Sequence, residues 1–301
     1  MKKLIYSALR KTKRLLRKVY SVPNNIVDFA LKAKRSNYSF NEKIKVFRFL
    51  LSNYLGREFS VKNRSEISQN IFDFKVTAYD YHTLNYLFKE IFLSNEYYFD
   101  TSKSDPKIID CGANIGMSIL FFKKLYPTSS IIAFEPNPYA FQLLEKNIKQ
   151  NDLTNIQLFN IGLSNINGEI DFFMNNNKGT LKGSFISERG GENKIIVETQ
   201  KLSKIINTNV FDLIKIDIEG AEIQVIEDLI SEGKINQINQ YLIEYHHRIN
   251  GAKSDFSVFI KHFEDNNYEY NIRTGFTLIG DFQDVFLNVY KDKNIANNVY
   301  N

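Results

Sequence analysis

From residue 107 onward, short apolar runs alternate with amphipathic segments of helical periodicity, and this order limits the fold more than any other feature of the sequence. The apolar runs, typical of buried strands, lie at 107–112, 130–136, 156–164, 211–217 and 240–247. The helical segments lie at 117–126, 139–151, 221–233 and 254–268. This alternation predicts βαβ units and an α/β fold with a mostly parallel, doubly wound sheet. Residues 271–280 and 284–292 predict an antiparallel hairpin that closes the sheet.

The net charge of +5 is unevenly distributed along the chain. Residues 1–35 contain eleven Lys and Arg and one acid, a net charge of +10. Residues 36–301 contain 28 basic and 33 acidic residues, a net charge of −5. A mildly acidic body is not expected to bind nucleic acid over a broad surface, so the basic arm needs its own explanation.

Residues 1–20 have the pattern of a basic amphipathic helix, with Leu, Ile, Ala and Val at helical spacing. Three interpretations stay open: peripheral contact with an anionic membrane, docking on the body or a solvated tail, and a targeting peptide. We favour the membrane contact. No apolar run approaches the length of a membrane span, and the single cysteine, Cys111, forms no internal disulfide. These features predict a cytoplasmic protein, peripheral at the membrane if the arm binds there.

We predict three regions: the arm at 1–35, a helical cap region at 36–100 and a main domain at 101–301. Asn24-Asn25 after Pro23 predict a break in the chain. In the cap, residues 41–55 and 81–93 have helical periodicity, and residues 71–80 alternate like one strand.

A glycine turn ends the strand at 107–112 and reads Asp110-Cys111-Gly112-Ala113-Asn114-Ile115-Gly116. Gly112 and Gly116 allow a tight turn and a close approach to a ligand, and the following helix start favours an anionic group. The pattern is neither the dinucleotide fingerprint nor a P-loop. Asp110 offers an acceptor for an ammonium group, so the turn suits an amino-acid moiety.

Glu135 ends the next strand, where a carboxylate accepts both hydroxyls of a ribose. Together with the glycine turn, it predicts a binding site for S-adenosylmethionine made by Asp110, Gly112, Ala113, Asn114, Gly116 and Glu135. Phe134 and Asn137 either contact adenine or ribose, or serve as core packing and turn.

The segments 108–127, 131–148 and 213–226 resemble the FkbM family of S-adenosylmethionine-dependent methyltransferases in order and spacing. The block LIKIDIEGAE at 213–222 is the most specific part of this resemblance. The resemblance implies a class I, Rossmann-like methyltransferase fold and O-methyl transfer, frequently to hydroxyls of sugars or polyketides. It also implies that Asp110, Gly112, Asn114, Gly116 and Glu135 bind the cofactor.

Methyl transfer to an alcohol requires a base, and two strand ends supply candidates. Asp217 ends the strand at 211–217 and Glu219 follows it, and His246 lies near the end of the strand at 240–247. Strand alternation puts Glu244 and His246 on one face and His247 on the other. We predict His246, Asp217 and Glu219 as catalytic residues, and take Glu222 as an acid suited to a helix start.

Asp217, Glu244 and His246 also have the chemistry of a divalent-metal site. Because the chain lacks an HExxH motif and paired cysteines, we predict no metal. The glycine-rich segment 175–193 is either a substrate lid or disordered.

The sequence thus predicts an O-methyltransferase that acts on a sugar or glycan hydroxyl, free or lipid-linked, with no nucleic-acid partner. One alternative is a non-catalytic binding or assembly protein of glycan synthesis. A third, a nucleic-acid methyltransferase, is disfavoured because Asp217-Ile218-Glu219-Gly220 stands where amino-directed enzymes have an Asn/Asp-Pro-Pro-aromatic motif. The acceptor and the oligomeric state are not determined by the sequence.

Overall fold

The computed structural model describes residues 23–59, 66–175, 183–249, 255–275 and 282–291. By compactness it divides into two units, residues 1–94 and residues 95–301. The arm predicted for residues 1–20 lies outside the described residues, so its membrane contact stays a prediction. Within the described part of the chain, no helix is both long and apolar enough to cross a membrane.

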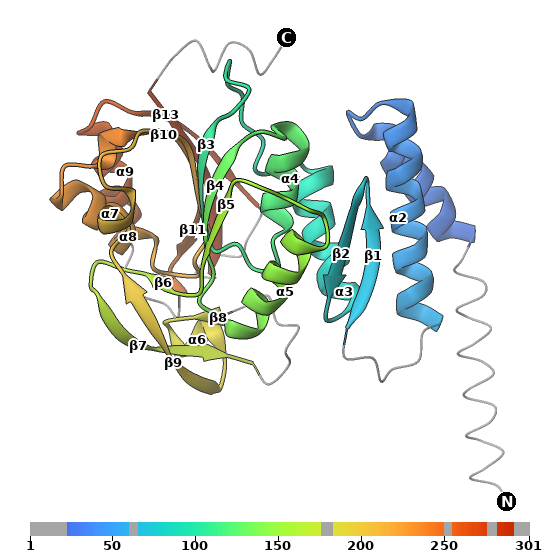
Figure 1. Cartoon of the computed structure of the whole chain (residues 1–301), viewed down its shortest axis with the longest axis horizontal. Helices are drawn as coiled ribbons and strands as arrows, with labels where there is room; N and C mark the ends of the chain where they lie inside the picture. The colour runs from blue at the N-terminus through green and yellow to red at the C-terminus, as the bar shows by residue number, and fades with distance from the viewer. Residues whose placement is uncertain (1–22, 60–65, 176–182, 250–254, 276–281, 292–301) are drawn as a thin grey trace, which may run out of the picture. The chain divides into compact units, whose positions relative to one another are not determined.

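The first unit combines helices with a short hairpin. Residues 23–35 are helical. The other elements are α2 (Phe40–Phe59), β1 (Ile67–Ile71), β2 (Phe74–Ala78), α3 (Tyr81–Leu87) and the π-helical turn η1 (Phe88–Leu93). In Figure 1 the hairpin lies alongside α2. Its core is aromatic: the Phe49 and Phe88 rings lie 4.1 Å apart, and Phe72 and Phe92 lie 5.6 Å apart.

Two predictions for the first unit were wrong. The break predicted at Asn24-Asn25 is instead the first turn of a helix that begins at Pro23. Proline is tolerated at the first position of a helix, because the backbone N–H that it lacks would have no partner within the helix there. The single strand predicted for 71–80 is a two-stranded hairpin that reverses at Phe72, which has a left-handed backbone (φ 54°). No Gly, Pro or Asn-Gly pair marks this turn in the sequence.

The second unit is built on a seven-stranded sheet in the order β12-β13-β11-β10-β3-β4-β5. Its strands are β3 (Lys107–Cys111), β4 (Ser130–Phe134), β5 (Ile156–Phe159), β10 (Phe211–Ile216), β11 (Ile238–His247), β12 (Glu269–Thr274) and β13 (Gln283–Tyr290). Strands β5, β4, β3, β10 and β11 are parallel neighbours, and β13 is antiparallel to both β11 and β12. The predicted doubly wound α/β sheet with an antiparallel closing hairpin is confirmed.

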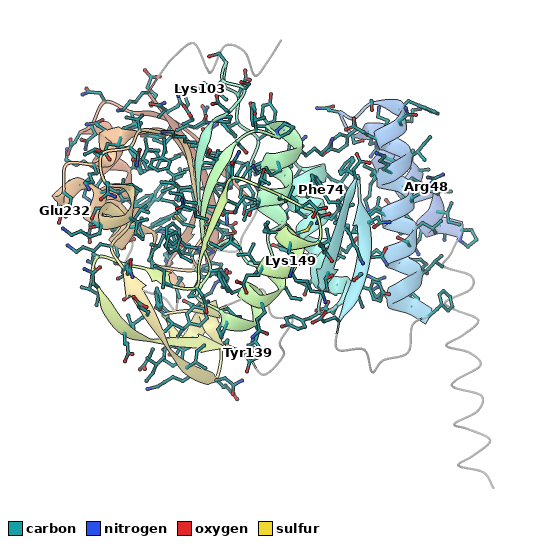
Figure 2. The ribbon with its side chains drawn as sticks, viewed as in Figure 1. Arg48, Phe74, Lys103, Tyr139, Lys149 and Glu232 are labelled. Atoms are coloured by element: carbon teal, nitrogen blue, oxygen red, sulfur yellow. The ribbon has the colours of Figure 1, made fainter. Side chains whose placement is uncertain are left out.

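Helices cover both faces of this sheet (Figure 1). On one face lie α4 (Met117–Leu125) and α5 (Pro138–Lys149), and on the other α8 (Glu222–Ser231) and α9 (Phe256–Glu264). Figure 2 shows side chains filling the space between the layers. All six residues of β10 are buried and four of them are apolar, which explains why the central strands appear as mostly apolar runs.

A second, four-stranded sheet has the order β6-β9-β7-β8. It contains β6 (Gly162–Leu163), β7 (Gly168–Met174), β8 (Gly183–Ser184) and β9 (Asn193–Gln200), accompanied by α6 (Ser187–Gly190) and α7 (Leu202–Ile206). The segment 175–193, expected to be a lid or disordered, therefore contains a strand and a helix in its described part. Residues 176–182 lie outside the described residues.

The two edges of the main sheet can be identified from labelled side chains in Figure 2. Lys103 marks the amino edge, where its Nζ lies 2.6 Å from Asp212 Oδ1 at the start of β10. Tyr139 marks the carboxyl edge, near the start of α5. In doubly wound sheets, ligands bind beyond the carboxyl edge.

Candidate functional site

The turn between β3 and α4 approaches its neighbours too closely for any side chain at Gly112. The backbone of Gly112 has φ +85°, and a Cβ atom there would lie 1.9 Å from the carbonyl oxygen of Asp217. The amides of Gly112 and Ala113 both donate to Phe134 O, at 3.0 and 2.9 Å. Gly116, with φ +90°, is the N-cap of α4. Both residues have a left-handed backbone, which favours glycine at these positions.

Glu135 lies beside this turn, immediately after β4, and its carboxylate is fixed by two backbone amides. Asn114 N donates to Oε2 and Asn137 N donates to Oε1, each at 2.8 Å. Burial raises the pKa of Glu135 to about 7, against the effect of these two hydrogen bonds and of the Lys215 charge. Each carboxylate oxygen keeps acceptor capacity for a further hydroxyl donor.

The neighbours of Glu135 have structural roles. Phe134 is buried and stacks on Phe159, with ring centroids 5.3 Å apart. Asn137 caps α5, since its Oδ1 accepts from the amide of Tyr139 at 3.0 Å. The sequence left open whether these residues contact a nucleoside or have structural roles. The structure shows structural roles, core packing for Phe134 and a turn for Asn137.

Asp110 is fully buried, and protein groups surround its carboxylate. Ser118 Oγ donates to Oδ2 at 2.5 Å, and Lys215 Nζ lies 3.3 Å from Oδ1. The ammonium group expected to belong to a ligand is thus, in this structure, that of Lys215. Asp110 acts on the glycine turn through this lysine, because Lys215 Nζ donates to Gly112 O at 2.7 Å.

Lys215 belongs to the candidate site, although the sequence reasoning missed it. It is 2% exposed. Burial alone would lower its pKa, but the charges of Asp110 and Asp217 outweigh burial and raise it. A lysine inside the apolar run FDLIKI was the available signal, because a buried ammonium group requires charged partners.

A cluster of acids surrounds His246 at the end of β11. Glu222 Oε1 lies 2.7 Å from Nδ1. Around Nε2 lie carboxylate oxygens of four residues, at 3.3 to 4.0 Å: Glu219 (3.3 Å), Asp217 (3.9 Å), Asp284 (3.9 Å) and Glu244 (4.0 Å). The structure therefore brings together the three residues predicted to be catalytic, and it adds Glu222, Glu244 and Asp284.

Burial lowers the pKa of His246, but the charge and hydrogen bond of Glu222, with Glu219 and Asp217, outweigh burial and raise it to about 10. An imidazole with this pKa holds its proton at pH 7, which does not suit the predicted role of a free general base. The neighbouring Glu244 has a pKa well above its usual range because it is buried and close to Asp217.

The loop after β10 positions two of the acids. Asp217 Oδ2 accepts from the hydroxyl of Tyr97 at 3.1 Å, which leaves Oδ1 on the side of His246. Glu219 has a left-handed backbone (φ 57°), its carbonyl accepts from Ser184 Oγ at 2.5 Å, and its carboxylate pairs with Arg189 of α6. A strained residue held by several contacts is common at functional sites.

Strand alternation places His247 as the sequence predicted, on the other face from Glu244 and His246. Its ring lies 6.0 Å from that of Tyr245 and 5.9 Å from that of Phe256. Asp284 reaches the cluster because β13 pairs with β11 in a register that sets Asp284 opposite His246.

Asp217 contacts both the glycine turn and the cluster around His246. The carbonyl oxygen of Asp217 meets Gly112, while the side chain of Asp217 faces both Tyr97 and His246. A ligand held at the turn and a second ligand held at the cluster would thus meet at the carboxyl ends of β3 and β10.

Comparison with known proteins agrees with this architecture. The chain is similar to methyltransferase sdnD of Sordaria araneosa, with 31% identity over 179 residues, 49% of this chain and 69% of that protein. It is similar to 2-O-methyltransferase NoeI of Sinorhizobium fredii, with 32% identity over 149 residues, 44% of this chain and 59% of NoeI. It also matches hexuronic acid methyltransferase AglP of Haloferax volcanii, at 23% identity over 150 residues, 49% of this chain and 59% of AglP.

The family model of the methyltransferase FkbM domain matches residues 110–270, more than half of the chain. This range begins at Asp110 in the glycine turn and includes Glu135, Lys215 and the loop at 217–222. It also includes His246. The resemblance drawn from the sequence is confirmed, and the chain belongs to the FkbM family of methyltransferases.

Proposed function

We propose that this protein transfers a methyl group from S-adenosylmethionine to a hydroxyl of a sugar or glycan. The observation that carries the proposal is the adjacency of two half-sites, the Glu135 carboxylate with its glycine turn and the acid-rich cluster around His246. Methyltransferases of the family require a methyl donor, and the names of NoeI and AglP connect relatives with O-methylation and with hexuronic acid.

The residues of the first half-site fit the donor. The ionised Glu135 carboxylate is oriented by the amides of Asn114 and Asn137 and suits two vicinal hydroxyls. Gly112, Ala113 and Gly116 belong to the tight turn at which α4 begins, and a helix start favours an anionic group. Bound S-adenosylmethionine would supply a methyl group activated on a sulfonium. Asp110 supports this turn through Lys215.

The second half-site would receive the acceptor. Methyl transfer to an alcohol releases a proton, and an ionised carboxylate beside the acceptor can accept it. Glu244 belongs to the cluster with Asp217, Glu219 and His246, and its Oε1 lies 4.0 Å from His246 Nε2. We assign the proton to Glu244, and we assign Asp217, Glu219 and His246 to the centre that holds the reacting hydroxyl.

A comparison of glycans and metabolites from cells with and without the protein tests the proposal. We expect products that are lighter by one methylene in cells without the protein, restored by the wild type and not by Glu135→Ala. Restoration by Glu135→Ala, or unchanged carbohydrates with a changed methylation of nucleic acid, would contradict it.

A further inference from the structure

The geometry around His246 points to a binding site for one divalent cation of the Mn²⁺ or Mg²⁺ class, with His246 Nε2, Asp217 and Glu219 as ligands. We propose this site in place of the absence of metal predicted from the sequence. The inference that this site binds a cation depends only on the geometry of the cluster. The catalytic role of the cation rests on the proposed methyl transfer.

The orientation of the His246 ring is the first argument. Histidines that bind metals almost always donate their other ring N–H to a carboxylate or carbonyl, which directs the remaining lone pair at the metal. His246 Nδ1 lies 2.7 Å from Glu222 Oε1, and Gly220 N fixes that same oxygen at 2.9 Å. When a cation takes the place of one ring proton, this contact keeps the remaining proton on Nδ1 and leaves the Nε2 lone pair for the ion.

The second argument is the unused hydrogen-bonding capacity of Nε2. The His246 side chain is 1% exposed. Nε2 has no hydrogen-bond partner among the residues that the structure describes. A buried ring nitrogen without a partner is costly, and this one is directed into a group of carboxylates.

The spacing of the oxygens fits a common ion. Atoms of Asp217, Glu219 and His246 that can bind a metal all lie within 4.8 Å of one another. Two ligands at about 2.1 Å from one octahedral ion are separated by roughly 3.0 Å in adjacent positions and roughly 4.2 Å in opposite positions. The distances from Nε2 to Glu219 Oε2 (3.3 Å) and to Asp217 Oδ1 (3.9 Å) fall in this range.

The charges around the cluster favour a cation. Five carboxylates lie within 4.0 Å of the His246 ring nitrogens. Among the residues that the structure describes, two basic side chains contact these acids. Lys215 lies beside Asp217, and Arg189 lies beside Glu219 and Asp284. Carboxylates with one imidazole are ligands suited to Mn²⁺ or Mg²⁺, and the absence of thiolates disfavours a structural zinc site.

A cation here would act on the acceptor in a defined way. As a Lewis acid bound beside Glu244, it would lower the pKa of a coordinated hydroxyl, so that a carboxylate could accept the proton. Glu222 would be a positioning residue, because it contacts His246 and not the ion.

The test is a titration of the chelator-treated, full-length protein with MnCl₂, read from the EPR signal of free Mn²⁺, with MgCl₂ as competitor. We expect one bound Mn²⁺ per chain in the wild type, and affinity at least about tenfold weaker in His246→Gln, Asp217→Asn and Glu219→Gln. Glu222→Gln should also weaken binding, by about tenfold. The matched controls, His82→Gln and Glu145→Gln, alter exposed residues and should bind as the wild type does.

Far-ultraviolet circular dichroism and thermal unfolding of the same variants verify that each one is folded. No binding of Mn²⁺ by the wild type, or equal binding by the three ligand variants, would overturn the site. Loss of binding in Glu244→Gln and Asp284→Asn but not in Asp217→Asn and Glu219→Gln would overturn the assigned ligands. If Mn²⁺ binds as expected but carbohydrates are not methylated, the proposed function fails and the metal site stands.

Discussion

Lys215 Nζ lies 3.3 Å from Asp110 Oδ1, and both side chains are buried in the middle of the sheet. The pair joins β10 to β3 at the point where the glycine turn begins, because the same ammonium group donates to Gly112 O. Breaking a buried ion pair by removing one partner leaves an uncompensated charge, so this contact has a measurable consequence for stability.

We predict that Lys215→Met lowers the free energy of unfolding by about 3–5 kcal/mol, because the Asp110 carboxylate then stays buried without its cation. Urea unfolding followed by circular dichroism measures the change. The double variant Asp110→Asn/Lys215→Met should recover part of the loss, since it removes both charges. A double variant less stable than the lysine variant alone would contradict this account of the pair.

Gly112→Ala should destabilise the protein more than Gly233→Ala. Both glycines have positive φ angles, but a Cβ at Gly233 would meet no atom within 4 Å, whereas one at Gly112 would meet the Asp217 carbonyl. Gly233→Ala should cost about 1 kcal/mol for its backbone conformation alone. Gly112→Ala should cost about 2 kcal/mol more, because the backbone must move. Equal thermal stabilities of the two variants would contradict the close contact.

The affinity for S-adenosylmethionine should depend on the ionisation of Glu135. The pKa of Glu135 is raised to about 7, so the carboxylate is ionised above that pH and protonated below it. If the ionised form accepts the ligand's hydroxyls, affinity should be about tenfold weaker at pH 6 than at pH 8. Glu135→Gln should lose this difference, and the variant controls for titration of the ligand itself. The same pH dependence in the variant would place the titrating group elsewhere.

Glu244→Gln should reduce turnover by about 100-fold or more, because the amide cannot accept the proton of the acceptor hydroxyl. Steady-state rates across a pH series, with saturating cofactor, provide the measurement. Binding of S-adenosylmethionine should be retained, since Glu244 is assigned to the acceptor half-site. Turnover equal to that of the wild type would move the base to another carboxylate of the cluster.

Much of the second unit could be predicted from the sequence. Buried parallel strands appear as short apolar runs and surface helices have an apolar stripe, so β3, α4, β4 and α5 were found in the correct order. The strand ends also predict that Asp217, Glu219 and His246 belong to one site.

The remaining features depend on contacts between distant segments. Asp284 comes to face His246 only because β13 inserts between β11 and β12. Arg189 reaches Glu219 because α6 forms inside a segment rich in glycine and polar residues, which the sequence describes equally well as a loop. Glu222 looked like an ordinary acid at a helix start, and its contact with His246 required the packing of α8 against β11.

The most direct test of the central claim is a calorimetric titration with S-adenosylmethionine of three proteins: the wild type, Glu135→Ala and His246→Ala. We place the cofactor at Glu135 and the acceptor chemistry at His246. We therefore expect saturable binding by the wild type, nearly unchanged affinity in His246→Ala despite lost turnover, and loss of binding in Glu135→Ala. No binding by the wild type, or equal binding after Glu135→Ala, would contradict the account.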